Sequence, residues 1–89
     1  MKVDYLPSFI KDLKSLRGAS VYEPIRELVF EVVPGYQSFQ EFQKIKKLKN
    51  ADHAYRLRVG AYRIGLVFEN GVITFTRVLH RKEIYRYFP

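Results

Sequence analysis

Three arginines in one short segment indicate chemistry on a phosphate group. The segment YRLRVGAYRI, residues 55–64, contains Arg56, Arg58 and Arg63. A guanidinium group stays charged at physiological pH and can bind two phosphate oxygens at once through parallel hydrogen bonds. Like charges placed side by side on a sheet repel one another, so such a cluster is most stable with an anion among its members. Ordinary solvated arginines on an open surface are the alternative interpretation.

The spacing predicts that a β-hairpin brings the three arginines together. Alternate residues of a strand face opposite sides of a sheet, so Arg56 and Arg58 share one face. If the turn between the two strands begins at Gly60 and has two residues, Arg58 lies opposite Arg63 and Arg56 lies opposite Gly65. The glycine would then leave space beside the guanidinium groups.

A second hairpin continues the same sheet. The Asn-Gly pair at 70–71 strongly favours a two-residue turn, which places Leu66 opposite Phe75 and Ile64 opposite Arg77. Arg77 falls on the apolar face in this register, which requires either a β-bulge or a position at the end of the sheet. The opposite, open face is predicted to collect small, polar and basic side chains: Arg56, Arg58, Arg63, Gly65, Val67, Thr74, Thr76, Val78 and His80.

Apolar spacing predicts two helices before this sheet. The first lies between Pro7 and Gly18, and the second has its apolar residues at helical spacing over 25–33. A possible capping box at Ser20–Glu23 begins the second helix, and Pro-Gly at 34–35 ends it. The predicted fold class is α+β in the order β-α-α-β-β-β, with both helices on one face of a mainly antiparallel sheet. The remaining expected elements are strands at 2–6, 54–59, 62–69 and 72–79 and a short helical turn, capped by Ser38 and Glu41, within 38–45.

The composition is that of one globular domain over residues 1–89. With 47% apolar and 16% aromatic residues, the chain can form a packed core. It contains no cysteine, so neither a disulfide nor a thiolate metal site is available. No segment has the apolar run of a signal peptide or of a membrane span of ~20 residues. We therefore expect a cytoplasmic protein that does not act at a membrane.

The positive charge is concentrated in the second half of the chain. Residues 1–43 contain five basic and six acidic side chains, whereas residues 44–89 contain eleven basic and three acidic ones. This asymmetry favours a polyanionic partner, and a basic face kept for solubility is the alternative. Within the basic half, Lys46, Lys47 and Lys49 are candidate RNA-binding residues, and nearby aromatic rings could stack on bases.

Other chemistries are not indicated. The two histidines, His53 and His80, and the nine scattered acidic residues show no metal-ligand spacing. The sequence has no glycine-rich phosphate loop and no nucleophile elbow. We therefore expect a protein that uses neither metal nor cofactor, whose basic face carries any chemistry.

Three motifs make the sequence similar to a known family. They are KKLKN at 46–50, YRLRVGAYRI at 55–64 and LHRKEIY at 79–85. Together they resemble the RelE branch of the RelE/ParE superfamily of bacterial and archaeal toxins, and the opening MKVDYLPSFIKDLKSL resembles the first strand and helix of that family. The resemblance implies a compact fold similar to microbial ribonucleases, cleavage of mRNA in the ribosomal A site, and neutralisation by a cognate antitoxin.

The resemblance also implies the site and its reaction. The ribose 2′-OH attacks the adjacent phosphorus, while Arg63 and Arg81, assisted by Arg58, stabilise the developing charge. Some relatives have lysines at positions 56 and 58, one of which can act as a base, but arginine cannot lose its proton near neutral pH. His80 is therefore the expected general acid or base. Tyr85 is expected to stack on the base beside the cleaved phosphate, and donation to the leaving oxygen is the alternative. The implied catalytic set is Arg56, Arg58, Arg63, His80, Arg81 and Tyr85.

Two alternatives from other functional classes stay open. One is a ParE-like toxin that inhibits DNA gyrase by binding, and the other is a non-catalytic module that binds RNA or the ribosome. The presence of Arg63, Arg81 and Tyr85 together with His80 favours the nuclease over the gyrase inhibitor. The expected partners are mRNA, the ribosome and an antitoxin with an acidic or amphipathic segment.

Overall fold

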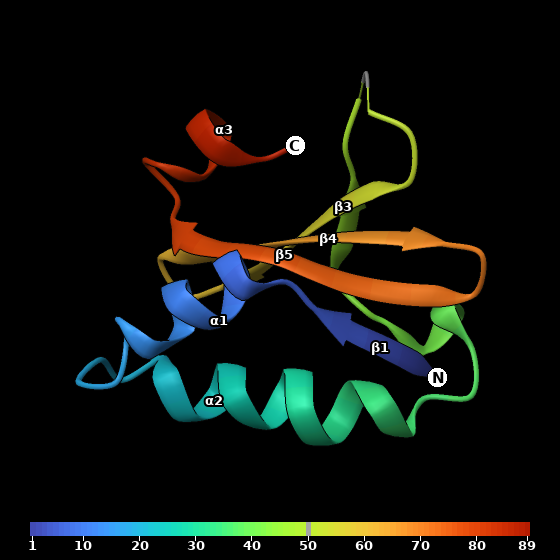
Figure 1. Cartoon of the computed structure of the whole chain (residues 1–89), viewed down its shortest axis with the longest axis horizontal. Coiled ribbons are helices and arrows are strands. Elements are labelled where there is room, and N and C mark those ends of the chain that lie inside the picture. The colour runs from blue at the N-terminus through green and yellow to red at the C-terminus, as the bar shows by residue number, and fades with distance from the viewer. Residues whose placement is uncertain (50) are drawn as a thin grey trace.

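A five-stranded sheet with helices on both faces forms the protein in a computed structural model that describes residues 1–49 and 51–89. The strands lie in the order β1-β5-β4-β3-β2; β1 is parallel to β5, and every other pair is antiparallel. Figure 1 shows α1 and α2 below the sheet and α3 above it. The elements are β1 (Lys2–Tyr5), α1 (Pro7–Lys14), α2 (Tyr22–Glu27), η1 (Leu28–Val32), η2 (Val33–Gly35), η3 (Phe39–Glu41), β2 (Ile45–Lys47), β3 (Ala54–Val59), β4 (Tyr62–Glu69), β5 (Val72–His80) and α3 (Ile84–Tyr87).

The predicted α+β fold is confirmed, with two additions. The expected first strand, two helical regions and three-stranded meander are all present. The two additions are β2, which lies in the basic run, and α3, which has four residues; neither was predicted from the sequence. Both additions change the face that carries the arginines, because β2 extends that face and α3 covers part of it. No helix among the described residues is long and apolar enough to cross a membrane.

The first hairpin has the predicted register. Arg58 pairs with Arg63 and Arg56 pairs with Gly65. The turn between β3 and β4 begins at Gly60, whose φ of 58° lies in the left-handed region that glycine adopts without strain. At the next turn, both Asn70 and its glycine neighbour have positive φ, as a tight hairpin of this kind requires.

A β-bulge shifts the register of the second hairpin, and this is one of the two alternatives that the position of Arg77 predicted. Leu66 pairs with Phe75 as predicted, but Gly65 pairs with Arg77, so Thr76 is the extra residue. The predicted pairing of Ile64 with Arg77 is therefore wrong. The Thr76 hydroxyl donates a hydrogen bond to the carbonyl of Gly65 at 2.9 Å, and the Ser8 hydroxyl donates to the carbonyl of Thr76 at 2.7 Å.

The bulge reverses the faces of every residue after it. Val78 pairs with Ile64 and is 1% exposed in the core, so its predicted position on the open face is wrong. His80 pairs with Tyr62, so it lies on the helix-covered side and not among the arginines. Arg77 lies opposite Gly65 on the arginine face, the face on which Thr76 and Val78 were predicted.

The main core lies between the sheet and the first two helical regions. Tyr22 to Gly35 is helical throughout, as α2, η1 and η2 in succession. The predicted capping box at Ser20–Glu23 does not form, because Val21 is the N-cap and Glu23 pairs instead with Arg26. The capping box of Ser38 and Glu41 does form. The buried core residues are Phe9, Leu13, Leu16, Ile25, Val29, Val33, Phe42, Leu57, Ile64, Leu66, Ile73, Phe75 and Val78.

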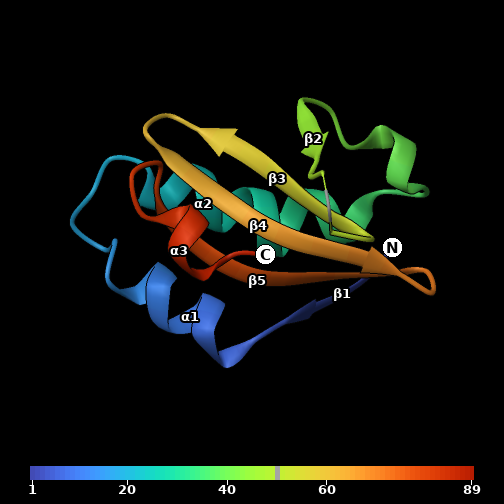
Figure 2. The same cartoon turned by 90° about the horizontal axis from the view of Figure 1, so that it is seen from above.

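A second, smaller apolar cluster lies on the opposite face of the sheet. Its buried members are Ala54 of β3, Ile84 of α3 and Phe88. Figure 2 shows α3 lying across β4 and β5 when the sheet is seen from above. The predicted open surface is therefore divided into a part covered by α3 and a part that carries the arginines.

Candidate functional site

Arg63 is the centre of the arginine cluster and the one buried charged side chain among the described residues. It is 8% exposed, although it lies in a strand beside the hairpin turn. Its guanidinium donates hydrogen bonds to the main-chain carbonyls of Gly60 at 3.1 Å and Tyr62 at 2.9 Å. These bonds fix the guanidinium to the turn without neutralising its charge.

The charges around Arg63 are all positive. Burial lowers the pKa of Arg63, and the positive charges of Arg58, Arg56 and Arg81 lower it further in that order. In the described part of the chain, the ion pairs join Arg26 and Arg77 to acidic side chains and include none of these four arginines. The site is therefore a concentration of uncompensated positive charge, which an anion would stabilise.

Tyr85 extends over this cluster from α3. Its hydroxyl accepts a hydrogen bond from the guanidinium of Arg56, and the Arg56 guanidinium carbon lies 5.5 Å from the centre of the tyrosine ring. Tyr85 is 59% exposed, so much of its ring remains open to solvent. An exposed aromatic ring beside guanidinium groups is suited to stack on a nucleic-acid base.

Arg81 reaches the cluster from the segment after β5. Its main-chain N–H donates to the carbonyl of Ala61 at 2.9 Å, which joins this segment to the turn between β3 and β4. The side chain is exposed, and its charge acts on Arg63. Arg63 is thus the fixed member of the cluster, and Arg81 is an exposed member beside it.

The prediction that His80 lies on the arginine face is wrong, because the bulge at Thr76 turns it to the other side. Its ring packs edge-on against Tyr62, with 5.6 Å between ring centres. Its Nδ1 accepts a hydrogen bond from the main-chain N–H of Lys82 at 3.1 Å. The imidazole therefore holds the main chain at Lys82, next to Arg81, by a hydrogen bond.

The three candidate lysines do not lie on one face of the sheet. Lys46 pairs with Arg56 across β2 and β3, so it extends the arginine face by one strand. Lys47 pairs with Tyr55 and therefore lies on the helix-covered side. Lys49 follows β2 in a turn and is exposed.

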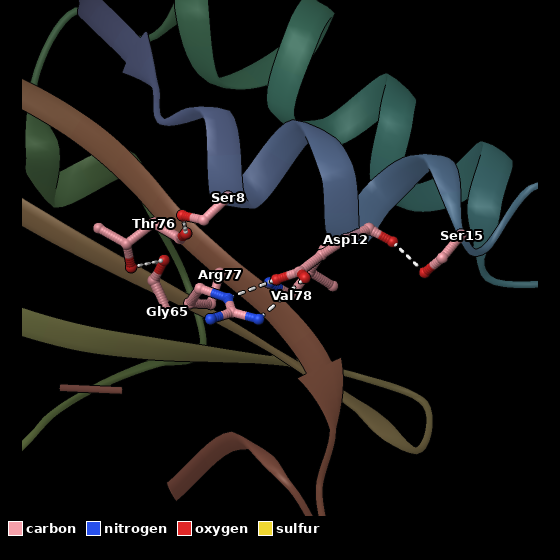
Figure 3. Close-up of polar contacts among 7 residues, drawn as sticks. All are labelled: Ser8, Asp12, Ser15, Gly65, Thr76, Arg77 and Val78. Carbon is pink, nitrogen blue, oxygen red and sulfur yellow. Dashed lines mark hydrogen bonds and ion pairs between the residues drawn. The ribbon is translucent and has the colours of Figure 1, made fainter. Parts of the chain in front are cut away.

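Arg77 shares the arginine face but belongs to a different contact. Figure 3 shows it reaching Asp12 of α1, whose two carboxylate oxygens accept hydrogen bonds from its guanidinium at 2.7 and 3.0 Å. One of these oxygens also accepts the main-chain N–H of Val78 at 3.1 Å. Arg77 therefore joins α1 to β5 and is absent from the candidate site.

Two features of the site were not predicted from the sequence pattern. Lys46 was predicted as an RNA-binding residue, but its place beside Arg56 follows from β2, a three-residue strand whose sequence IKK gives little strand signal. The space beside Gly65 was expected to remain open, yet the ring of Phe88 fills it. The glycine itself was the signal for a close approach by another group.

The arrangement can bind and stabilise an anion. One cation is fixed by hydrogen bonds, exposed cations surround it, and an aromatic ring stands beside them. No group of three or more histidine and acidic side chains that could hold a metal ion occurs outside Asn50, the one residue left undescribed. The geometry suits a phosphodiester with an unstacked base next to it.

Comparisons with known proteins give relatives over the full length of the chain, although no protein-family model matches it. The chain is 43% identical over 90 residues to toxin RelE3 of Methanocaldococcus jannaschii, with 100% of both chains covered. It is similar to a chain of the RelB–RelE antitoxin–toxin complex from Methanococcus jannaschii, with 41% identity, a TM-score of 0.79, and 97% and 99% of the two chains covered. It is also similar to a chain of the archaeal RelE–RelB complex from Pyrococcus horikoshii OT3, with 26% identity, a TM-score of 0.58, and 90% and 93% covered.

Proposed function

This chain belongs to the RelE family of type II toxins, and from this premise we propose that it cleaves mRNA on the ribosome as a metal-free endoribonuclease. The observation that carries the proposal is the buried, uncompensated Arg63 guanidinium with other cations around it. The free energy of burying a cation among cations is unfavourable, and a phosphate in the site would lower that cost. The cytoplasm, where mRNA and ribosomes meet, is the proposed place of action.

The proposed reaction is an internal transesterification of the RNA backbone. The ribose 2′-oxygen forms a bond to the adjacent phosphorus, and the bond from phosphorus to the 5′-oxygen of the next nucleotide breaks with its electron pair staying on that oxygen. The proton of the 2′-OH passes to solvent and the 5′-oxygen takes up a proton from solvent, which leaves a 2′,3′-cyclic phosphate and a free 5′-hydroxyl. Negative charge accumulates on the phosphoryl oxygens in the transition state. Arg63 stabilises that charge from a fixed position, and Arg81 and Arg58 add exposed donors to the same oxygens.

Arg56 and Tyr85 act on the nucleotide beside the cleaved bond in this proposal. The hydrogen bond from Arg56 orients the tyrosine hydroxyl and leaves the ring exposed. The ring stacks on the unpaired base, which fixes the ribose so that its 2′-OH is in line with the leaving oxygen. Lys46, next to Arg56 on the neighbouring strand, contacts the RNA backbone further along.

We propose a positioning role for His80, and acid–base catalysis by this residue is the alternative. Its Nδ1 accepts the Lys82 N–H, and its ring packs on Tyr62 away from the arginines. The test compares His80→Asn, whose amide oxygen can accept the same N–H, with His80→Ala, which removes the acceptor. A positioning role predicts that the asparagine variant keeps most of the activity and the alanine variant loses it. Equal loss in both variants would support acid–base catalysis.

The proposed protein partner is a cognate antitoxin. The two archaeal structures named above are complexes of a RelE chain with RelB, described for the first as an antitoxin–toxin complex. An acidic or amphipathic segment of the partner would cover the basic face of this chain. Charge pairing at that face predicts that the affinity falls when the salt concentration rises.

The experiment that tests the function is cleavage of a defined mRNA with and without programmed ribosomes. Wild-type protein is compared with Arg81→Ala and with Arg17→Ala, a matched control that removes an exposed arginine from the segment after α1. We expect cleavage only with ribosomes, lost in Arg81→Ala and kept in Arg17→Ala. No cleavage by folded wild-type protein under any condition would exclude the nuclease, and inhibition of gyrase supercoiling by that protein would establish the alternative class.

A further inference from the structure

Gly65 provides a socket for an aromatic ring next to the arginine cluster. It lies opposite Arg56 of β3 and Arg77 of β5, on the face that carries the site. A Cβ atom at this position would lie 2.6 Å from two ring atoms of Phe88 and 2.9 Å from a third. Phe88 is 5% exposed, so its ring fills the space that the missing side chain leaves. We call this space the Gly65 socket.

The same contact holds α3 on the sheet. A helix of four residues is not stable alone, so packing sets its position. Ile84 at its start is 1% exposed, and the main-chain N–H of Phe88 donates to the carbonyl of Ile84 at 2.9 Å. The Tyr87 ring adds a weaker outer contact, since its centre lies 4.8 Å from the Arg77 guanidinium carbon and it is 54% exposed.

Tyr85 projects from between these two buried anchors. It is exposed itself, and its contact in the site is with the flexible guanidinium of Arg56. Neither of these features fixes the tyrosine backbone, whereas Ile84 and Phe88 do. Removing Phe88 from the socket releases one end of α3 and with it the position of Tyr85.

We propose that Phe88, seated in the Gly65 socket, is the positioning residue that holds Tyr85 over the arginine cluster. The effect on catalysis rests on the proposed function, because it requires Tyr85 to contact RNA. The position of Tyr85 in the free protein does not depend on that function. The two parts can therefore be tested separately.

The first measurement follows the ring signals of Tyr85 by NMR in the protein without RNA. The signals are assigned by their loss in Tyr85→Phe, and the partly buried Tyr5 ring, whose hydroxyl donates to the carbonyl of Val29 and which packs against the main core, reports on that core. We expect Phe88→Ala to move the Tyr85 signals away from their wild-type positions, towards those of a tyrosine that has lost its contact with Arg56, while the Tyr5 signals stay in place. Gly65→Ala should do the same, because its methyl group displaces the Phe88 ring.

The second measurement is a double-mutant cycle on cleavage rate. Loss of base stacking predicts a roughly 10-fold lower rate for Tyr85→Ala. Phe88→Ala should lower the rate by a similar factor in the wild type but by less than about twofold in the Tyr85→Ala background, since its effect passes through Tyr85. A merely structural effect of Phe88 would lower the rate by the same factor in both backgrounds.

A second double-mutant cycle, which combines Gly65→Ala with Phe88→Ala, tests the Gly65 socket itself. Gly65→Ala should lower the rate strongly in the wild type and add little to Phe88→Ala, because the ring that it displaces is already absent. Tyr85 signals that keep their wild-type positions in both Phe88→Ala and Gly65→Ala would overturn the proposal. If the wild type cleaves no RNA, the proposed function fails, and the NMR measurement still decides the role of Phe88.

Discussion

Arg63 and Arg77 lie on the same face of the sheet, on adjacent strands, in opposite electrostatic surroundings. Arg77 donates to both carboxylate oxygens of Asp12, and this hydrogen bonding raises its pKa. Arg63 donates to main-chain carbonyls, and burial together with the neighbouring arginines lowers its pKa. One guanidinium is neutralised within the protein, whereas the other is held in place with its charge uncompensated.

The difference separates a structural arginine from a candidate catalytic one. Residue type, strand position and face do not distinguish them, since both are arginines beside Gly65 in the sheet. What distinguishes them is a carboxylate, that of Asp12, which contacts Arg77. A charge that is paired internally contributes to stability, whereas one that is buried among like charges lowers stability until an external anion binds.

The largest expected effect is on catalysis in Arg63→Ala. Removing a fixed cation from the transition state should lower the cleavage rate by ~10²–10³. The free energy of unfolding should change by less than about 1 kcal/mol, because the lost hydrogen bonds are offset by the removal of a desolvated charge. Single-turnover cleavage and urea unfolding measure the two quantities, with Arg17→Ala as the control. A large loss of stability with normal cleavage would show that Arg63 is a structural arginine and not a catalytic one.

The converse effect is expected for Arg77→Ala. The Asp12 side chain is 10% exposed and would lose its cation, so the free energy of unfolding should fall by about 3 kcal/mol. Asp12→Ala should cost a similar amount, and the double variant should be more stable than the sum of the two losses predicts. Cleavage per folded molecule should stay close to that of the wild type. Additive losses of stability would show that the two side chains are not coupled.

A smaller effect is expected from inorganic phosphate. An anion that binds at Arg63 should stabilise the folded wild type by about 1.4 kcal/mol at ten times its dissociation constant, a shift of several degrees in Tm. Arg63→Gln should lose this shift, whereas Arg77→Lys, which keeps a cation next to Asp12, should retain it. Thermal unfolding at increasing phosphate concentration measures both. An equal shift in all three proteins would point to a general salt effect at the protein surface.

Local sequence patterns were enough to predict the meander and part of the site. The glycine and asparagine turn residues fixed the register of both hairpins near their turns, and alternation placed Arg56, Arg58 and Arg63 on one face. At the bulge, the Ser8 hydroxyl of α1 donates to the carbonyl of Thr76, a tertiary contact that no pattern within β5 reports. Arg77 on the apolar face indicated either a bulge or a sheet end but did not decide between them, so alternation carried past it placed His80 on the wrong face.

The parts that were missed depend on contacts between distant segments. The four residues of α3 have no periodicity of their own, and their position comes from Ile84 and Phe88 packing on β3, β4 and β5. The three residues of β2 are in a basic run that is equally compatible with a solvated turn. Pairing with Arg56 and its neighbours makes that run a strand. The pairing of Arg77 with Asp12 likewise depends on the packing of α1 beside β5.

The smallest expected effect compares two adjacent lysines of β2. Lys46 faces the arginine side and Lys47 faces the helix-covered side, so they differ in direction but not in charge or strand. The probe is a single-stranded RNA whose cleavable 2′-OH is replaced by hydrogen. Lys46→Ala should reduce the magnitude of the negative slope of log affinity against log salt by ~0.7 for this RNA. Lys47→Ala should leave the slope unchanged, which makes it the matched control. Equal changes would mean that the overall positive charge of β2, and not the arginine face, attracts the RNA.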